Sequence, residues 1–237
     1  MRVLPLLALA ACTAEPVVET EPFGPVGIVA PAEDGLRFGF PLAEPDLVVS
    51  AAVGVDHDPQ EQEGVLAAAL CTNYDGQAFP YCYDQHDGSD FLLVDGFTTM
   101  DEGSVDVLAA ADGVVISIEE EQYDRCHIEG TGISCDGYDV IGNHVIVEHA
   151  DGTVSKYWHL MQYSVRVDVG DEVTCGDVMA KVGSSGVSSG PHLHFEVETA
   201  DGVSFDPYAG AFSQEETWWA EQKGIDELPG PGCTAAE

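Results

Sequence analysis

The sequence NHVIVEHADGTVSKYWHL, from Asn143 to Leu160, contains two runs in which apolar and polar residues alternate. Asp151 and Gly152 stand between the runs and form a dipeptide typical of a tight β-hairpin turn. An alternation with a period of two places every second side chain on the same face of a strand. The stretch therefore predicts two antiparallel strands with one buried face.

The same pattern extends in both directions along the chain. From about Tyr81 to Tyr208 short apolar runs alternate with Gly and Asp-Gly turns, and DGVVISIEE, Asp112 to Glu120, is another clear strand. The 237 residues are 45% hydrophobic and include 26 Gly and 13 Pro, which suits one turn-rich core better than a helical bundle. We expect a mainly β fold, an antiparallel β-sheet or sandwich with few short helices.

The chain is strongly acidic. Lys and Arg together number 7 and Asp and Glu together number 43, which gives a formal net charge of −36 at pH 7. A field of this sign repels phosphate backbones and anionic lipid headgroups. We therefore expect no nucleic-acid partner.

The N-terminus has the pattern of an export signal. MRVLPLLALAA, residues 1–11, joins one positive charge to an apolar run shorter than the about 20 residues that span a bilayer. LAAC, Leu9 to Cys12, resembles the lipobox of bacterial lipoproteins, in which the cysteine receives a diacylglyceryl group. We expect an exported cell-envelope protein anchored to a membrane through lipidated Cys12. An ordinary signal peptide with an incidental cysteine is the alternative.

Composition divides the rest of the chain. Residues 12–33 are rich in Pro, Glu, Thr and Val without periodicity, as expected of a lipidated tether. Residues 34–80 are expected to form an N-terminal extension in which VVSAAVGV could be a strand and QEQEGVLAAAL a short helix. Residues 81–210 hold the β pattern. Residues 211–237 are predicted to be a helical tail, with the two tryptophans of SQEETWWAEQKG packed on the domain.

The cysteine count indicates disulfides. With Cys12 set aside, six cysteines remain, and an even number is typical of an exported, oxidised chain. No CxxC spacing occurs, which disfavours a zinc–thiolate cluster. Two pairs are close in sequence, and the hypothesis that follows from them joins Cys71 to Cys82, Cys126 to Cys135, and Cys175 to Cys233.

Two histidines stand one residue apart in GPHLHFEV. In a strand this spacing directs His192 and His194 to one face, while Leu193, Phe195 and Val197 point to the other and face the core. A histidine pair beside an apolar face is hard to explain by structure alone, because buried polar groups need partners. The motif indicates metal binding or acid–base chemistry.

Two further motifs carry histidines. HDGSD places His86 and Asp90 four residues apart around a glycine, which lets the chain bend so that imidazole and carboxylate converge on one ion. With one more histidine they would supply the three ligands that catalytic zinc takes. YWHL is expected to put Tyr157 and His159 on one strand face and Trp158 on the other. Alone, such a histidine favours a half-buried strand position.

The ordered set of motifs resembles a known family. HDGSD, VIVEHADGTVSKYWHL and VDVGDEVTCGDVMAKVGSSGVSSGPHLHFEV, within residues 84–208, look like the lysostaphin and LytM-type zinc endopeptidases that cut peptidoglycan peptides. The resemblance implies an antiparallel β fold with an open groove, of the barrel-sandwich kind shared with glucose-permease domains. Matched position by position, it implies the Zn²⁺ ligands His86, Asp90 and His194 and the catalytic histidines His159 and His192.

The function implied by the resemblance is hydrolysis of stem peptides or cross-links of peptidoglycan. Zinc would lower the pKa of water from 15.7 towards about 7, and one of the two catalytic histidines would take its proton while the other donates to the oxyanion. No ligand or catalytic position is missing, which favours an active enzyme. One alternative is a non-catalytic envelope lipoprotein that binds peptidoglycan or activates an amidase. Another is a zinc protease that acts on Gly-rich proteins.

Two regions depart from the family or lie outside the motifs. Glu119 to Asp139 lengthens a connection between strands and is expected to be stapled by a disulfide and to form a wall of the groove. The segment before Tyr81 could cover the groove as an inhibitory flap. The four remaining histidines are expected to have structural roles, namely His57, His127, His144 and His149.

Overall fold

The computed structural model describes residues 27–31, 35–60, 70–103 and 105–233. The expected signal peptide, Cys12, most of the tether and the expected helix near residues 61–69 lie outside these ranges. Within them, no helix is long and apolar enough to cross a bilayer. The predicted mainly β fold is confirmed, and the described residues contain one α-helix, α1 (Phe97–Asp101), and one 3₁₀ helix, η1 (Pro45–Leu47).

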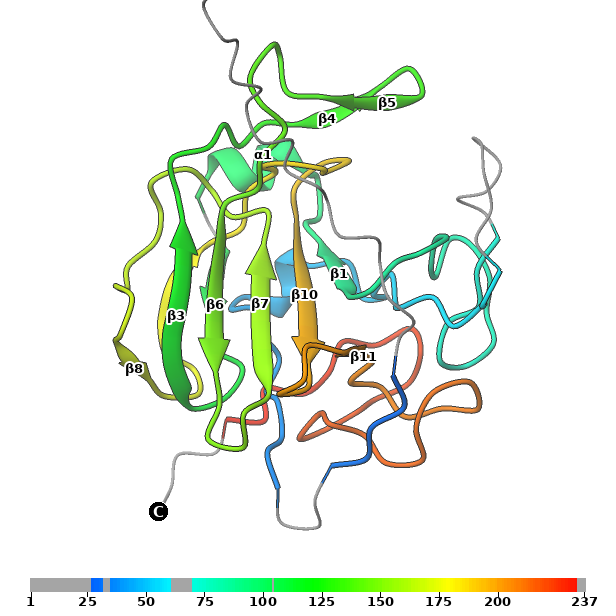
Figure 1. The fold of residues 1–237 in the computed structure, drawn as a ribbon. Coiled ribbons are helices and arrows are strands. Elements are labelled where there is room, and N and C mark those ends of the chain that lie inside the picture. Colours follow the sequence, from blue (N-terminus) through cyan, green and yellow to red (C-terminus); the bar gives the residue numbers. More distant parts are fainter. Residues whose placement is uncertain (1–26, 32–34, 61–69, 104, 234–237) are drawn as a thin grey trace, which may run out of the picture.

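An antiparallel sheet of seven strands forms the centre of the molecule (Figure 1). Its strands follow the order β1–β10–β7–β6–β3–β8, and β11 pairs with β10 beside this path. The predicted hairpin is β6 and β7, whose turn contains Gly152 at φ 86°. The strands of this sheet are β1 (Ser89–Leu92), β3 (Gly113–Glu119), β6 (His144–Glu148), β7 (Val154–Trp158), β8 (Glu172–Val173), β10 (His192–Glu198) and β11 (Ser204–Phe205).

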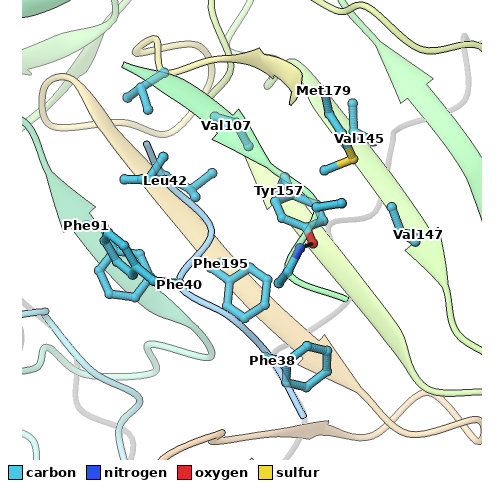
Figure 2. Close-up of a cluster of buried hydrophobic side chains, with 14 of the residues drawn as sticks. Phe38, Phe40, Leu42, Phe91, Val107, Val145, Val147, Tyr157, Met179 and Phe195 are labelled. Carbon is cyan, nitrogen blue, oxygen red and sulfur yellow. Dashed lines mark hydrogen bonds between the residues drawn. The ribbon is translucent and has the colours of Figure 1, made fainter. Parts of the chain in front are cut away.

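One face of the sheet packs against a second layer to form the core. This layer contains the small sheet of β2 (Asp106–Leu108) and β9 (Val178–Lys181), and the N-terminal segment that carries Phe38, Phe40 and Leu42. These side chains meet residues of the large sheet in one buried cluster (Figure 2). The extension is therefore part of the hydrophobic core.

The segment VVSAAVGV does not form a continuous strand. Val53 bridges to Asp90 at the outer edge of β1, and Val48 bridges to Leu93 one residue past the end of this strand. The Asp90 amide donates to the Val53 carbonyl at 2.8 Å, and the Val53 amide donates to the Asp90 carbonyl at 3.1 Å. The extension thus holds the strand that carries Asp90.

The predicted C-terminal helix is wrong: residues 211–233 form turns and bends. The backbone groups that a helix would use internally pair instead with distant segments. Trp218 accepts from the amide of Phe38, and Ala220 donates to the Phe38 carbonyl. The expected packing of the tryptophans is confirmed, since Trp219 is 1% exposed and its ring contacts Phe195.

All three expected disulfides are present. Two of them join cysteines that are 11 and 9 residues apart and so form short loops. The third ties the C-terminal segment to the turn before β9. The middle one staples the inserted hairpin of β4 (His127–Glu129) and β5 (Gly132–Ser134), which lies beyond one end of the large sheet (Figure 1). The pairs are Cys71–Cys82, Cys126–Cys135 and Cys175–Cys233.

A buried hydroxyl offers a test of this packing. Tyr157 is fully buried, and its hydroxyl accepts from the amide of Ala110 at 2.8 Å. Tyr157→Phe would leave that amide unpaired, so we expect a loss of about 1–3 kcal/mol in the free energy of unfolding. Urea denaturation with intact disulfides measures it. The control Tyr163→Phe, at a residue 68% exposed, is expected to change stability by less than about 0.5 kcal/mol. Equal stabilities of the two variants would contradict the assignment.

Candidate metal centre

Three side chains from the predicted metal set converge. His86 Nε2 lies 3.1 Å from Asp90 Oδ1 and 3.2 Å from His194 Nδ1, and the last two atoms are 2.9 Å apart. All three residues are buried. Two imidazole nitrogens and one carboxylate oxygen are the donors that catalytic zinc takes from a protein. The set therefore fits a zinc ion with one position left for water or substrate.

The pairing of β1 with β10 brings the ligand atoms together. Asp90 stands directly opposite His194 in the register. The chain just before β1 passes so close to the His194 ring that a Cβ at Gly88 would lie 2.6 Å from it. Only glycine fits this approach. The glycine of HDGSD is thus required by close packing against the third ligand.

The N-terminal extension fixes the orientation of His86. The Nδ1–H of this ring donates to the carbonyl of Gly54 at 2.7 Å, so Nε2 is the nitrogen that offers a lone pair to the site. Asp56 holds the neighbouring chain, because its carboxylate accepts from the amides of Asp58, Thr72 and Gln85. Neither residue was foreseen as part of the site.

Tyr83 also reaches the site from outside the predicted motifs. Its ring stacks on His86 with centroids 4.1 Å apart, and its hydroxyl lies 3.4 Å from Asp90 Oδ2. The residue directly follows Cys82 and is held beside the site by the Cys71–Cys82 loop. Proximity to HDGSD was the only signal in the sequence for this contact.

The two predicted catalytic histidines lie together beside the metal set. The ring centroids of His159 and His192 are 4.6 Å apart, and His192 Nε2 lies 3.4 Å from Asp90 Oδ1. The Nδ1–H of His159 donates to the carbonyl of Ser185, and that of His192 to the carbonyl of Gly190, each at 2.7 Å. Both rings are therefore oriented by backbone acceptors.

The predicted strand faces of YWHL are wrong. Tyr157 points into the core, while Trp158 and His194 are register partners on the site side of the sheet. The strand ends at Trp158, and His159 has a left-handed backbone with φ 64°. This break in the alternation turns His159 to the same side as Trp158. By contrast, the prediction for GPHLHFEV is confirmed, since Leu193, Phe195 and Val197 are fully buried in the core.

The electrostatics differ between the histidines. Burial lowers the pKa of His159 well below its usual value, and the neighbouring imidazoles act in the same direction. Burial also acts to lower the pKa of His194, but hydrogen bonds and charge from Asp87 and Asp90 outweigh it and raise the pKa to about 10. In the metal-free site His159 is therefore neutral at pH 7, whereas His194 is a charged imidazolium with a proton on each ring nitrogen.

The remaining histidines are engaged elsewhere. His149 contacts the Asp112 carbonyl and the Ser155 hydroxyl, and His57 pairs with buried Asp206 at 2.9 Å. The ring of His144 lies 4.4 Å from Trp158 on the site side of the sheet, with Nε2 2.9 Å from a serine hydroxyl. The structural roles expected for these residues agree with their contacts.

A family model describes this arrangement as a whole. The model of peptidase family M23 matches residues 85–207, which is more than half of the chain. The chain belongs to peptidase family M23. The matched residues of this M23 chain include every predicted ligand and catalytic position, from His86 to His194.

Individual relatives are more distant. The chain is 36% identical over 81 residues to the DD-carboxypeptidase/endopeptidase Mpg of Neisseria meningitidis, covering 34% of this chain and 18% of that protein. It is 26% identical over 138 residues to the peptidoglycan DD-endopeptidase ShyC of Vibrio cholerae, with coverages of 58% and 25%. It is 34% identical over 99 residues to the murein hydrolase activator EnvC of Escherichia coli, with coverages of 41% and 23%.

The chain spans about a quarter or less of the length of these three relatives. Among solved structures, a zinc-containing peptidase from Vibrio cholerae superposes with a TM-score of 0.46 at 23% identity. That superposition covers 74% of this chain and 44% of the other.

The pKa of His194 predicts how metal binding depends on pH. A cation bound at Nδ1 must displace the proton that the metal-free ring carries at pH 7. We expect zinc binding to release at least one proton per ion at pH 7, and the affinity to fall as the pH is lowered. Calorimetric titration in buffers of different ionisation enthalpy measures the proton count. Binding without proton release would contradict this protonation state.

Proposed function

We propose that this M23 chain is a zinc-dependent endopeptidase that hydrolyses stem peptides or cross-links of bacterial peptidoglycan. The observation that carries the proposal is the convergence of His86, Asp90 and His194 within 3.2 Å of one another, with His159 and His192 beside them. The names of the endopeptidase relatives support the choice of substrate. We assign the zinc ligands to His86 Nε2, Asp90 Oδ1 and His194 Nδ1.

Zinc held by these ligands would polarise a peptide carbonyl and lower the pKa of water towards about 7. His159 acts as the general base, because its Nδ1–H is held by Ser185 and its Nε2 is unprotonated at neutral pH. With its Nδ1–H on the Gly190 carbonyl, the His192 ring in its imidazolium form would donate Nε2–H to the oxyanion. A proton then passes from one of these rings to the leaving amine.

The competing proposal is a non-catalytic member of the family that binds peptidoglycan or activates another hydrolase. The likeness to an activator over 99 residues is the reason to consider it. All five predicted site residues are present and grouped in this chain, which favours the enzyme. A protease of Gly-rich proteins would use the same site. Comparing the rates of hydrolysis of peptidoglycan and of a Gly-rich protein distinguishes these two activities.

The cellular location is proposed from the N-terminus and the substrate together. An export signal and a lipidated Cys12 would hold the domain at the membrane within reach of peptidoglycan. The three disulfides agree with an oxidising compartment outside the cytosol.

The first test compares zinc content with peptide release. The full chain, His86→Ala and His192→Ala are incubated with isolated sacculi, zinc is measured by mass spectrometry, and muropeptides are measured by chromatography. We expect one zinc and peptide release in the parent, loss of zinc in His86→Ala, and retained zinc with turnover lowered about 10²–10⁴-fold in His192→Ala.

The matched control is His127→Ala, at a histidine of the inserted hairpin that contacts the Arg125 carbonyl. This variant is expected to keep both zinc and turnover. Zinc binding by the parent without peptide release would contradict the enzyme and support the binding protein or activator.

The net charge predicts a salt dependence. Stem peptides carry carboxylates, which a protein of charge −36 repels. Raising the ionic strength from 0.1 to 1 M shortens the Debye length from about 10 to about 3 Å and screens this repulsion. We expect kcat/KM on sacculi to rise with NaCl. Activity that is highest in dilute buffer and falls steadily with salt would contradict the expectation.

A further inference from the structure

The histidines of the site differ in what holds their outer nitrogen. Three of them donate Nδ1–H to a backbone carbonyl at 2.7 Å. His194 is the exception: its Nδ1 points at Asp90, and its outer nitrogen, Nε2, lies 3.4 Å from Oδ1 of Asp87. A side-chain carboxylate therefore takes the place that a main-chain oxygen has for the other rings.

The backbone directs Asp87 to this position. It stands immediately before Gly88, whose contact with the His194 ring leaves no room for a side chain. Two residues later β1 begins to pair with β10, opposite Phe195. The carboxylate of Asp87 thus approaches the ring from the segment just before β1, and its side chain is only 18% exposed.

A second carboxylate near this nitrogen is engaged elsewhere. Glu196 accepts from the Ser204 hydroxyl at 2.7 Å and lies 3.3 Å from the ammonium of Lys156. Lys156 in turn pairs with Glu198 at 2.5 Å. Asp87 is therefore the carboxylate that remains for His194 Nε2.

We propose that Asp87 is a positioning residue of the metal centre: its carboxylate accepts Nε2–H of His194 and so directs the Nδ1 lone pair at the cation. A carboxylate behind a ligating imidazole fixes the tautomer, orients the ring and raises its basicity, and its loss weakens metal binding about 10–100-fold. The inference rests on the proposed zinc site, because both involve His194.

The same groups could instead hold a second cation. One ligand atom each from Asp87, His194 and Glu196 lies within 4.8 Å of the others. A cation there would have to replace Nε2–H of His194 and compete with the Lys156 ammonium for Glu196. Our proposal therefore requires a single zinc per chain.

The experiment measures zinc affinity of the full chain after metal removal, by competition with a chromophoric chelator. It compares the parent with Asp87→Asn, which keeps the shape but removes the charge, and with Asp87→Ala. Asp95→Asn is the matched control, because Asp95 is exposed in the turn after β1. Zinc stoichiometry and the ¹⁵N spectrum of the histidine rings of each zinc-loaded protein are recorded in parallel.

We expect one zinc per chain, with dissociation constants that increase from parent to Asn to Ala and at least about a tenfold change for Asn. The slowly exchanging Nε2–H signal of His194 should be lost in Asp87→Ala and kept in Asp87→Asn, whose amide oxygen still accepts the hydrogen bond, and Asp95→Asn should match the parent. Equal affinities of parent and Asp87→Asn, or two zinc ions in the parent, would overturn the inference alone. A parent that binds no zinc would contradict the proposed function itself.

Discussion

The antiparallel register of β1 and β10 is the constraint on which the rest of the site depends. It sets Asp90 opposite His194 and requires the glycine that lets the HDGSD chain pass against the ring. The same strand β10 presents Phe195 to the core and His194 to the site. Packing of one face therefore fixes the chemistry of the other, and a shift by a single residue would exchange them.

The N-terminal extension holds two of the proposed metal ligands in position. In its described residues, Phe38, Phe40 and Leu42 fill the core, while the Gly54 carbonyl orients His86 and the backbone of Val53 pairs with Asp90. These contacts support the first two proposed ligands. The family match begins at residue 85, so these supporting residues lie outside it.

Periodicity and motif spacing predict most of the fold and the grouping of the site. The alternation in HLHFEV fixes both its core face and its histidine pair, because the strand is regular over seven residues. The same rule fails for His159, where a left-handed residue ends the strand and reverses the side. The helix predicted near the C-terminus is also absent in residues 211–233, because the backbone there pairs with the Phe38 segment. Support from Gly54 and Asp87 depends on contacts in space that no local pattern records.

The bridge of Val53 to β1 limits how a peptide can pair with the edge of the sheet. The outer edge of a sheet ordinarily offers unpaired amides and carbonyls to which an extended chain can add as a further strand. At Asp90 both of these backbone groups are already paired with Val53. An extended peptide therefore cannot add to this edge as a further strand at Asp90, because the main-chain groups it would need are taken.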